Sequence, residues 1–450
     1  MANILVLMLG TGRASLTEGK QLEYRTGTYV RSDGGQGEVI TSFVGEAIVR
    51  LFSEESFDKV YILGTKNSQW HSVYAHSINE TATDKELDWF EKISEEIDRP
   101  QPTRPAWIKE VERAFGEKIG VKVECQITPV GRNEEELWNL FETIVKIPAE
   151  GDKISIDITH GLRFQPMFML LGLNYLKSIA ENIQIGRIFY GAWELGNEYY
   201  EGKAPIYDLS TFLDLVDWID GANSLQRYGD MKPILDIAKE KGFPSAFIQK
   251  GKEFDLALQL NKAGLLSYQA GAFHSQLMKV KKDETLDFKP YQLVSKAIER
   301  LPAQILKEQQ PWREMLLMAE RHLDKENQMT LAILATWEAI ITRLEALYPS
   351  ITGLQGFDKY KKMGYVARNG KVDEIRGTLT NFSKNAKRLS EFRNYVAHVR
   401  IEEKDTLNPK IILDEFPQLF KYFKQALESS EMDLIPQKLP ISPKEAVDVP

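Results

Sequence analysis

Short apolar runs that alternate with helical patterns constrain the fold of the first half of this chain more than any other feature. The run Ile4–Leu9 contains no polar residue, which is the pattern of a strand buried on both faces of a sheet. Further strand patterns cover Lys59–Leu63, Val121–Ile127, Lys153–Ile158, Arg187–Trp193 and Ala204–Leu209, and helical patterns cover Thr41–Phe52, Asp84–Ile97, Glu134–Val145 and Met167–Ile179. Such alternation predicts a mainly parallel sheet with helices on both faces. Residues 1–209 are therefore expected to form a doubly wound, Rossmann-like α/β domain, with a long loop or irregular hairpin over residues 13–38.

Glycine and polar residues follow three of these strands at the point where each strand ends. They are Gly10-Thr11-Gly12, Gly64-Thr65 and Thr159-His160-Gly161-Leu162-Arg163. Ligands of open parallel sheets bind beyond the carboxyl ends of the strands, where glycine N–H groups, hydroxyls and an arginine suit a phosphate. Gly10 to Gly12 fit a simple turn equally well, whereas Thr159 to Arg163 carry more chemistry than a turn requires. The dinucleotide fingerprint G-x-G-x-x-G is incomplete, because Ser15 stands at its third glycine.

The second half of the chain has a different pattern, because strand-like runs stop near Ser210 and helical patterns continue to about Ser429. Amphipathic segments cover Thr211–Ile219, Ser245–Leu266, Tyr291–Leu306 and Met329–Leu347, the last with apolar residues on one helix face. Residues 431–450 contain four prolines and few large apolar groups. We expect a helical linker at 210–325, a helical bundle at 326–430 and a flexible tail at 431–450.

Composition excludes several classes of protein. The 450 residues carry a formal net charge of −8, which argues against a protein coated in nucleic acid but permits one basic patch. The single cysteine, Cys125, cannot form an intrachain disulfide or a cysteine-based zinc site, so a reducing, cytoplasmic location is expected. No apolar run is long enough to span a membrane, and no metal-ligand cluster or phosphate-binding P-loop motif is recognisable. We therefore expect no metal and no cofactor.

A basic segment near the end of the chain places Arg393 and His398 five residues apart in a helical pattern. Five residues turn a helix by about 500°, so these two side chains point about 140° apart. Asn394 and His398, four apart, share a face. Two such helices packed antiparallel about a dimer axis could bring both types of side chain into one cleft. The alternative is a packed histidine beside Tyr395 and an arginine in a surface ion pair.

The chain resembles the CRISPR-associated CARF–HEPN ribonucleases of type III systems. The resemblance rests on Leu9-Gly-Thr-Gly12, Glu134-Glu-Glu-Leu-Trp-Asn-Leu-Phe141, Asp157-Ile-Thr-His-Gly-Leu-Arg-Phe-Gln-Pro166, Phe189-Tyr-Gly-Ala192 and Arg393 to His398, in this order. The segment Asp157–Pro166 is the most specific. It departs from the family at Leu162 and Phe164-Gln165, which bears on the shape of the pocket and not on its location.

The resemblance implies that residues 1–209 form a CARF domain, which binds a cyclic oligoadenylate at a homodimer interface. It also implies that residues 326–430 form a HEPN domain, which cleaves single-stranded RNA. Carried over by position, the ligand-binding residues are Gly10, Thr11, Gly12, Thr65, Thr159, His160, Gly161 and Arg163. The activator would be cyclic tetra- or hexa-adenylate, and a two-fold dimer suits a ligand with two-fold symmetry.

Cleavage of RNA through its own 2′-hydroxyl needs proton transfer and stabilisation of a charged phosphorane, and it needs no metal. Histidine suits the proton transfer and arginine the growing phosphate charge. His398 is assigned as acid/base, Arg393 as the stabiliser and Asn394 as an orienting partner, with 2′,3′-cyclic phosphate and 5′-hydroxyl products. Lys384, Lys387, Arg388 and Arg400 either hold the RNA backbone or form a solvated basic face, and Glu338 is either a partner of Arg393 or an ordinary exposed glutamate.

Three other functions remain open at this point. The chain could be a sensor of a cyclic nucleotide that cuts nothing, or its N-terminal domain could also degrade the ligand. A nicotinamide-dependent enzyme is the most distant of the three.

Overall fold

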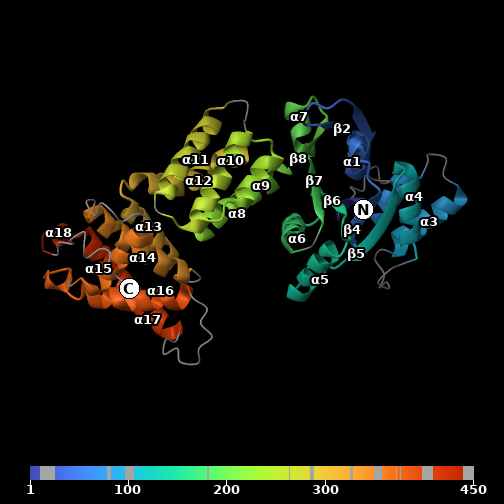
Figure 1. The fold of residues 1–450 in the computed structure, drawn as a ribbon. Coiled ribbons are helices and arrows are strands. Elements are labelled where there is room, and N and C mark those ends of the chain that lie inside the picture. The colour runs from blue at the N-terminus through green and yellow to red at the C-terminus, as the bar shows by residue number, and fades with distance from the viewer. Residues whose placement is uncertain are drawn as a thin grey trace. The chain divides into compact units, whose positions relative to one another are not determined.

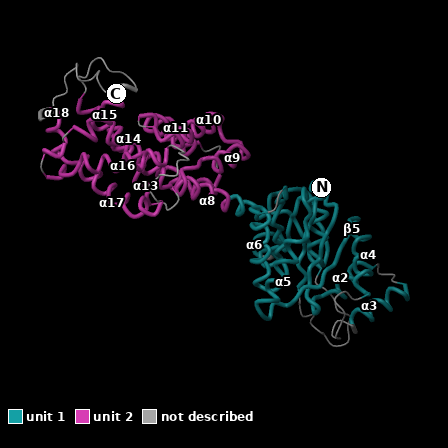
Figure 2. The backbone as a smooth tube through the Cα atoms, turned by 60° about the horizontal axis from the view of Figure 1, so that its bottom comes forward, with its two compact units in different colours: residues 1–214 teal, residues 215–450 magenta. Residues whose placement is uncertain are grey.

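The computed structural model describes residues 1–10, 26–78, 83–96, 106–179, 182–262, 264–283, 288–324, 328–348, 357–370, 372–375, 377–397 and 409–438. The chain divides into two compact units, Met1–Asp214 and Leu215–Pro450 (Figure 2). The first is a mixed α/β unit and the second is helical, which confirms the predicted fold class.

An eight-stranded sheet forms the centre of the first unit, in the order β3-β2-β8-β7-β6-β1-β4-β5. Its strands are β1 (Asn3–Leu9), β2 (Gly27–Arg31), β3 (Glu38–Thr41), β4 (Lys59–Thr65), β5 (Lys122–Thr128), β6 (Lys153–Asp157), β7 (Gln184–Gly191) and β8 (Ala204–Asp208). The pairs β7–β8 and β2–β3 are antiparallel, and the other strand pairs are parallel. The predicted loop or irregular hairpin thus contributes two strands to the sheet. The two strands pair as an antiparallel hairpin, which agrees with the second of the two alternatives, and both are short and only partly buried.

Two layers of helices cover the sheet (Figure 1). On one face α1 (Val44–Leu51), α2 (Trp70–Ser77) and α4 (Ile108–Ile119) form a core with Leu5, Leu7 and Leu9 of β1, while α3 (Asp84–Glu96) packs on α2. On the other face α5 (Glu134–Val145) and α6 (Gln165–Ile179) form a core with Ile4, Val6 and Met8. Successive strand side chains point to opposite faces, so a strand covered on both sides must be apolar throughout.

The strand order reverses beside β1, where ligands of such sheets bind. After β1 the chain forms β2 and β3 at the far edge of the sheet, returns to β4 and β5 on one side of β1, and then crosses to β6 and β7 on the other. The carboxyl ends of β1 and β6 are therefore neighbours at the topological switch point.

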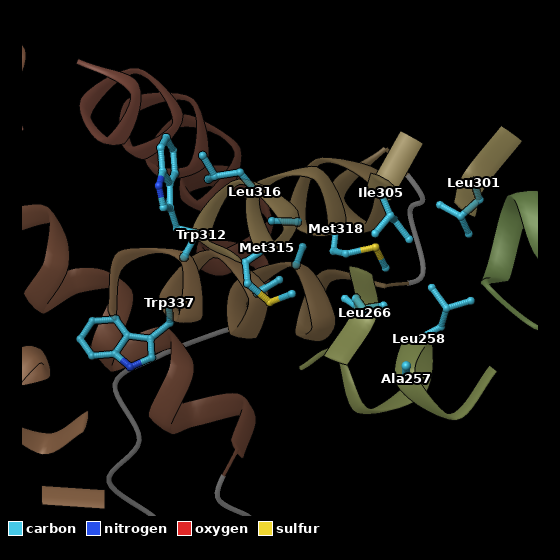
Figure 3. Close-up of a cluster of buried hydrophobic side chains, with 14 of the residues drawn as sticks. Ala257, Leu258, Leu266, Leu301, Ile305, Trp312, Met315, Leu316, Met318 and Trp337 are labelled. Atoms are coloured by element: carbon cyan, nitrogen blue, oxygen red, sulfur yellow. The ribbon is translucent and has the colours of Figure 1, made fainter. Parts of the chain in front are cut away.

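The second unit is built from helices around one continuous hydrophobic core (Figure 1). The helices are α8 (Thr211–Tyr228, which crosses the unit boundary), α9 (Lys232–Glu240), α10 (Ser245–Leu260), α11 (Leu265–Lys282), α12 (Lys289–Lys307), α13 (Pro311–Leu323), α14 (Met329–Leu347), α15 (Phe357–Asn369), α16 (Phe382–Ala397), α17 (Pro409–Glu428) and α18 (Ile435–Lys438). Figure 3 shows side chains from α10 to α14 in this core, among them Leu258, Leu266, Ile305 and Met318.

Two expectations for this region change. The pattern Ser245–Leu266 is broken by Asn261, which adopts a left-handed conformation (φ 48°) and caps α10. Packed structure also continues past residue 430, the expected start of the flexible tail, because Met432 and Ile435 are fully buried. The predicted division of the region at residue 325 stays a prediction.

Candidate functional site

A cavity of about 280 Å³ opens in the first unit at the switch point of the sheet. It is lined by Leu9, Gly10, Tyr29, Ser42, Phe43, Gln69, Thr159, His160, Gly191 and Trp193. Gly10 follows β1, whereas Thr159 and His160 follow β6. The cavity therefore lies where the topology places ligands in open α/β sheets.

The predicted pocket residues fall into three groups. Gly10, Thr159 and His160 line the cavity. Thr65, Gly161 and Arg163 are not among its lining residues. Thr11 and Gly12 lie outside the described residues.

Thr65 takes part in hydrogen bonds that join two strands. Only 2% of the residue is exposed. Its N–H donates to the Ser68 hydroxyl at 2.8 Å, and that hydroxyl donates to the Leu9 carbonyl at 2.9 Å. The Trp70 indole N–H donates to the Thr65 carbonyl at 2.8 Å. These bonds fix the turn after β4 against the end of β1.

Thr159 holds the loop after β6 against the end of β7. Its N–H donates to Asp157 Oδ1 at 3.0 Å, and its hydroxyl donates to the same oxygen. The Thr159 hydroxyl in turn accepts the Gly191 N–H at 2.7 Å. Asp157 is fully buried, and burial raises its pKa although the charge of His160 and the bonds from Thr159 oppose that effect. The buried carboxyl group of Asp157 therefore holds Thr159, a residue of the cavity wall, in place.

The turn after Thr159 presents His160 and Arg163 to solvent. Gly161 has φ +108°, and a Cβ there would lie 2.6 Å from Gln165 Oε1. That amide oxygen accepts the Leu162 N–H at 2.7 Å. Gly161 is thus required by the turn itself, and the buried Gln165 braces the turn, a role that no sequence signal indicated.

An aromatic wall of the cavity escaped the sequence analysis. Tyr29 of β2, Phe43 before α1 and Trp193 after β7 come from distant parts of the chain. The Tyr29 and Trp193 rings lie 6.2 Å apart, and burial, helped by the charge of Asp157, raises the pKa of Tyr29 to about 12. The only sequence feature that could have indicated this wall is Trp193, an aromatic residue close to the end of a strand.

Of the catalytic candidates in the second unit, the structure describes Arg393 and Asn394, both on α16, while His398 lies outside the described residues. Arg393 Nη1 donates to Asn394 Oδ1 at 3.1 Å. Glu338 on α14 accepts the Tyr360 hydroxyl of α15 at 2.7 Å. Burial raises the pKa of Glu338, against the opposing effects of Tyr360 and of the Arg393 charge. Glu338 is therefore a half-buried neighbour of Arg393, which corrects the alternative of an ordinary exposed glutamate.

A groove of about 750 Å³ between α16 and α17 contains three of the predicted RNA-backbone residues. It is lined by Lys384, Asn385, Lys387, Arg388, Glu391, Glu415, Gln418, Leu419 and Tyr422. Lys384 and Lys387 are exposed. Arg388 is paired with Glu415 at 2.8 and 3.1 Å and with Glu391 at 2.8 Å, so its charge is locally balanced. Arg400 lies outside the described residues.

The described residues contain neither a candidate membrane-spanning helix nor a candidate metal-binding cluster. No helix there is both long and apolar enough to cross a membrane. In the same residues, no group of three or more His, Cys, Asp or Glu side chains is placed to hold a metal ion.

Comparison with known proteins finds similarity in both the first unit and the whole chain. Residues 16–194 match the family model of the CARF domain of the CRISPR system endoribonuclease Csx1. Over 438 residues, or 94% of its length, the chain is 24% identical to CRISPR-associated protein MJ1674 of Methanocaldococcus jannaschii, of which it spans 66%. The matched region contains strands β2 to β7 and all of the cavity-lining residues except Leu9 and Gly10. The first unit is therefore similar to the CARF domain of Csx1, and most of the chain is similar to a CRISPR-associated protein.

Proposed function

We propose that this protein is an endoribonuclease that binds a cyclic oligoadenylate in its CARF domain and then cleaves single-stranded RNA with its C-terminal helices. The observation that carries the proposal is the cavity at the switch point of a unit that matches the Csx1 CARF family. Polar groups of Thr159 and His160 and an aromatic wall suit a ligand that combines phosphates with bases.

The size of the cavity supports a working dimer. About 280 Å³ lies just below the ~300–1,000 Å³ of pockets for drug-sized ligands, so it suits about one nucleotide. A ring of four or six nucleotides would extend beyond it. A second copy related by a two-fold axis would supply the same cavity to the other side of the ring.

An exposed apolar groove of about 600 Å³ on α5 and α6 supports self-association. It is lined by Glu134, Leu137, Trp138, Phe141, Phe168, Leu171, Asn174, Tyr175, Ser178 and Ile179. Trp138 is 58% exposed, Leu171 55% and Ile179 65%, a concentration of apolar surface typical of an interaction site. We propose that a second copy of this chain covers it. Sedimentation velocity should show a dimer that Leu171→Glu weakens and that Asn139→Glu, exposed on α5 outside the groove, does not. Equal dimerisation of both variants would contradict this role.

The chemistry proposed for the second unit rests on residue types and on the placement of α16. Arg393 would stabilise the phosphorane charge, Asn394 would orient a reacting group, and His398, one residue beyond the end of α16, would transfer protons. The neighbouring Glu338 and Tyr360 would position the guanidinium. Binding activates the enzyme only if the ligand favours the active arrangement over the resting one.

The test is cleavage of a labelled single-stranded RNA with and without cyclic tetra- or hexa-adenylate. We expect ligand-dependent cleavage in the wild type and at least a ~100-fold loss in Arg393→Ala and His398→Ala, as for loss of acid–base or charge-stabilising groups. Lys421→Ala, which removes an exposed charge from α17, is the matched control and should cleave normally. Undiminished cleavage by both catalytic variants would refute the assignment.

A further inference from the structure

A chain of hydrogen bonds leads from the interior of the first unit to the cavity wall at Ser42. The Ser42 hydroxyl lies 2.9 Å from His76 Nδ1, and His76 Nε2 lies 2.5 Å from Glu46 Oε2. The other carboxylate oxygen of Glu46 accepts Arg50 Nε–H at 2.8 Å. Of these residues only Ser42 lines the cavity. Serine, imidazole and carboxylate are thus connected in series, with the serine at the end that a ligand can reach.

The direction of these hydrogen bonds follows from the state of Glu46. Burial acts to raise its pKa, but the bonds from His76 and Thr41, with the charges of His76 and Arg50, outweigh burial and lower the pKa to about 2. The carboxylate is then an acceptor only. The Thr41 hydroxyl already donates to Glu46 at 2.8 Å, so it has no proton for His76 Nε2, 3.2 Å away. His76 Nε2 must therefore carry a proton and donate it to Glu46.

That arrangement determines what Ser42 offers a ligand. With the proton on Nε2, the Nδ1 atom of a neutral His76 is an acceptor, and the Ser42 hydroxyl donates to it. The lone pairs of the Ser42 oxygen then face the cavity. The group that fits them is a hydrogen-bond donor, such as the six-amino group of adenine. A carbonyl at the same position, as in inosine or guanine, would bring two acceptors together.

We propose that Ser42 reads the base of the bound nucleotide by accepting a hydrogen bond from the adenine amino group, and that His76 and Glu46 are positioning residues which fix this preference. The inference rests on the proposed function, because it names the base specificity of the same cavity.

Trp193 complements Ser42 on the cavity wall. The indole is 41% exposed and lies against β2 at Gly27, where a Cβ would be 1.9 Å from the ring. Glycine at position 27 therefore makes room for the indole beside the cavity. A base stacked on this ring would gain affinity regardless of its identity, because every base has a π-face. Stacking by Trp193 and reading by Ser42 are thus separable contributions.

The test compares binding of cyclic tetra- or hexa-adenylate with binding of the inosine ring of the same size, by calorimetry on the full-length protein. The wild type should prefer the adenine ring. Ser42→Ala should bind the adenine ring about 3- to 10-fold more weakly per cavity and lose the preference. Ser42→Thr keeps the hydroxyl and should retain the preference. Trp193→Ala should weaken both rings about equally, by ~5-fold or more.

Glu46→Gln tests the positioning role. Arg50 donates only, so the glutamine oxygen should turn toward it and the amide NH₂ toward His76. The imidazole proton then moves to Nδ1, the Ser42 hydroxyl proton turns into the cavity, and the preference should shift toward the inosine ring. If this variant does not fold, His76→Ala provides the same readout, with an expected loss of preference. Ser275→Ala, an exposed serine of α11 in the second unit, is the control and should behave as wild type.

The outcomes distinguish failure of the base-reading role of Ser42 from failure of the proposed function. If the wild type binds no cyclic oligoadenylate, the proposed function fails and the inference with it. If the wild type binds, but Ser42→Ala and Glu46→Gln keep the wild-type ratio of affinities for the two rings, the base-reading role of Ser42 is refuted while the proposed function stands.

Discussion

Thr159→Val tests whether the residue holds the site together, as its hydrogen bonds indicate, in addition to lining the cavity. Valine has nearly the shape of threonine but no hydroxyl. The substitution therefore removes the bond from the Thr159 hydroxyl to Asp157 and leaves the Gly191 N–H without its 2.7 Å acceptor. Thr159→Ser keeps the hydroxyl and loses only a methyl group, so it is the matched control.

The expected cost follows from the two lost bonds. An ordinary hydrogen bond contributes ~0.5–1.5 kcal/mol net, and a buried donor left without its acceptor costs ~1–3 kcal/mol. Together the lost bond to Asp157 and the unpaired Gly191 N–H predict a loss of about 1.5–4.5 kcal/mol for Thr159→Val. Thr159→Ser should lose less than about 1.5 kcal/mol, in the range of a single deleted methyl group.

Hydrogen exchange followed by mass spectrometry is the appropriate assay, because the two units can unfold separately and a single melting midpoint would mix them. Peptides from β6 and β7 should exchange faster in Thr159→Val, while peptides from α13 and α14 in the second unit serve as an internal reference. Equal protection of β6 and β7 in the valine and serine variants would refute the structural role assigned to the hydroxyl.

Three further predictions concern stability. The raised pKa of buried Asp157 means that its proton stabilises the fold below the unfolded pKa and that this stability is lost as pH rises through the folded value. Asp157→Asn should therefore gain stability relative to wild type as the pH rises above the ordinary range of an aspartate, by at most ~1.4 kcal/mol per pH unit, and a gain that shrinks with rising pH would contradict the raised pKa. Trp218 is fully buried and its indole nitrogen is unpaired, so Trp218→Ala should cost ~3–5 kcal/mol and Trp218→Phe clearly less, as measured by hydrogen exchange of peptides from the second unit; equal costs would show that ring packing is not the main contribution. Gly161→Ala should destabilise the loop after β6 by about 1–3 kcal/mol, because its φ of +108° strains any side chain, and unchanged exchange at the start of α6 would refute this.

Local sequence patterns determined the scaffold and the place of the cavity. A strand covered on both faces must be apolar at every position, so the run Ile4–Leu9 predicted a central strand with helices on both faces of the sheet. Because parallel strands end at the same edge, the polar residues after β1 and β6 could be placed together. Gly10, Thr159 and His160 do line the cavity.

Only the tertiary structure decided which other residues reach the cavity and what they do there. Tyr29, Ser42 and Trp193 meet because β2 pairs with β8, a pairing between segments far apart in the chain that no local periodicity encodes. The same holds for Glu46 of α1 and His76 of α2, which are thirty residues apart and are joined by a hydrogen bond. Thr65 is a residue type that can contact a ligand. Its N–H and its hydroxyl bond to Ser68, and these bonds connect β4 to β1. A sequence fixes the type of each side chain and its local periodicity, whereas its direction and its hydrogen-bond partner depend on distant segments brought together by folding.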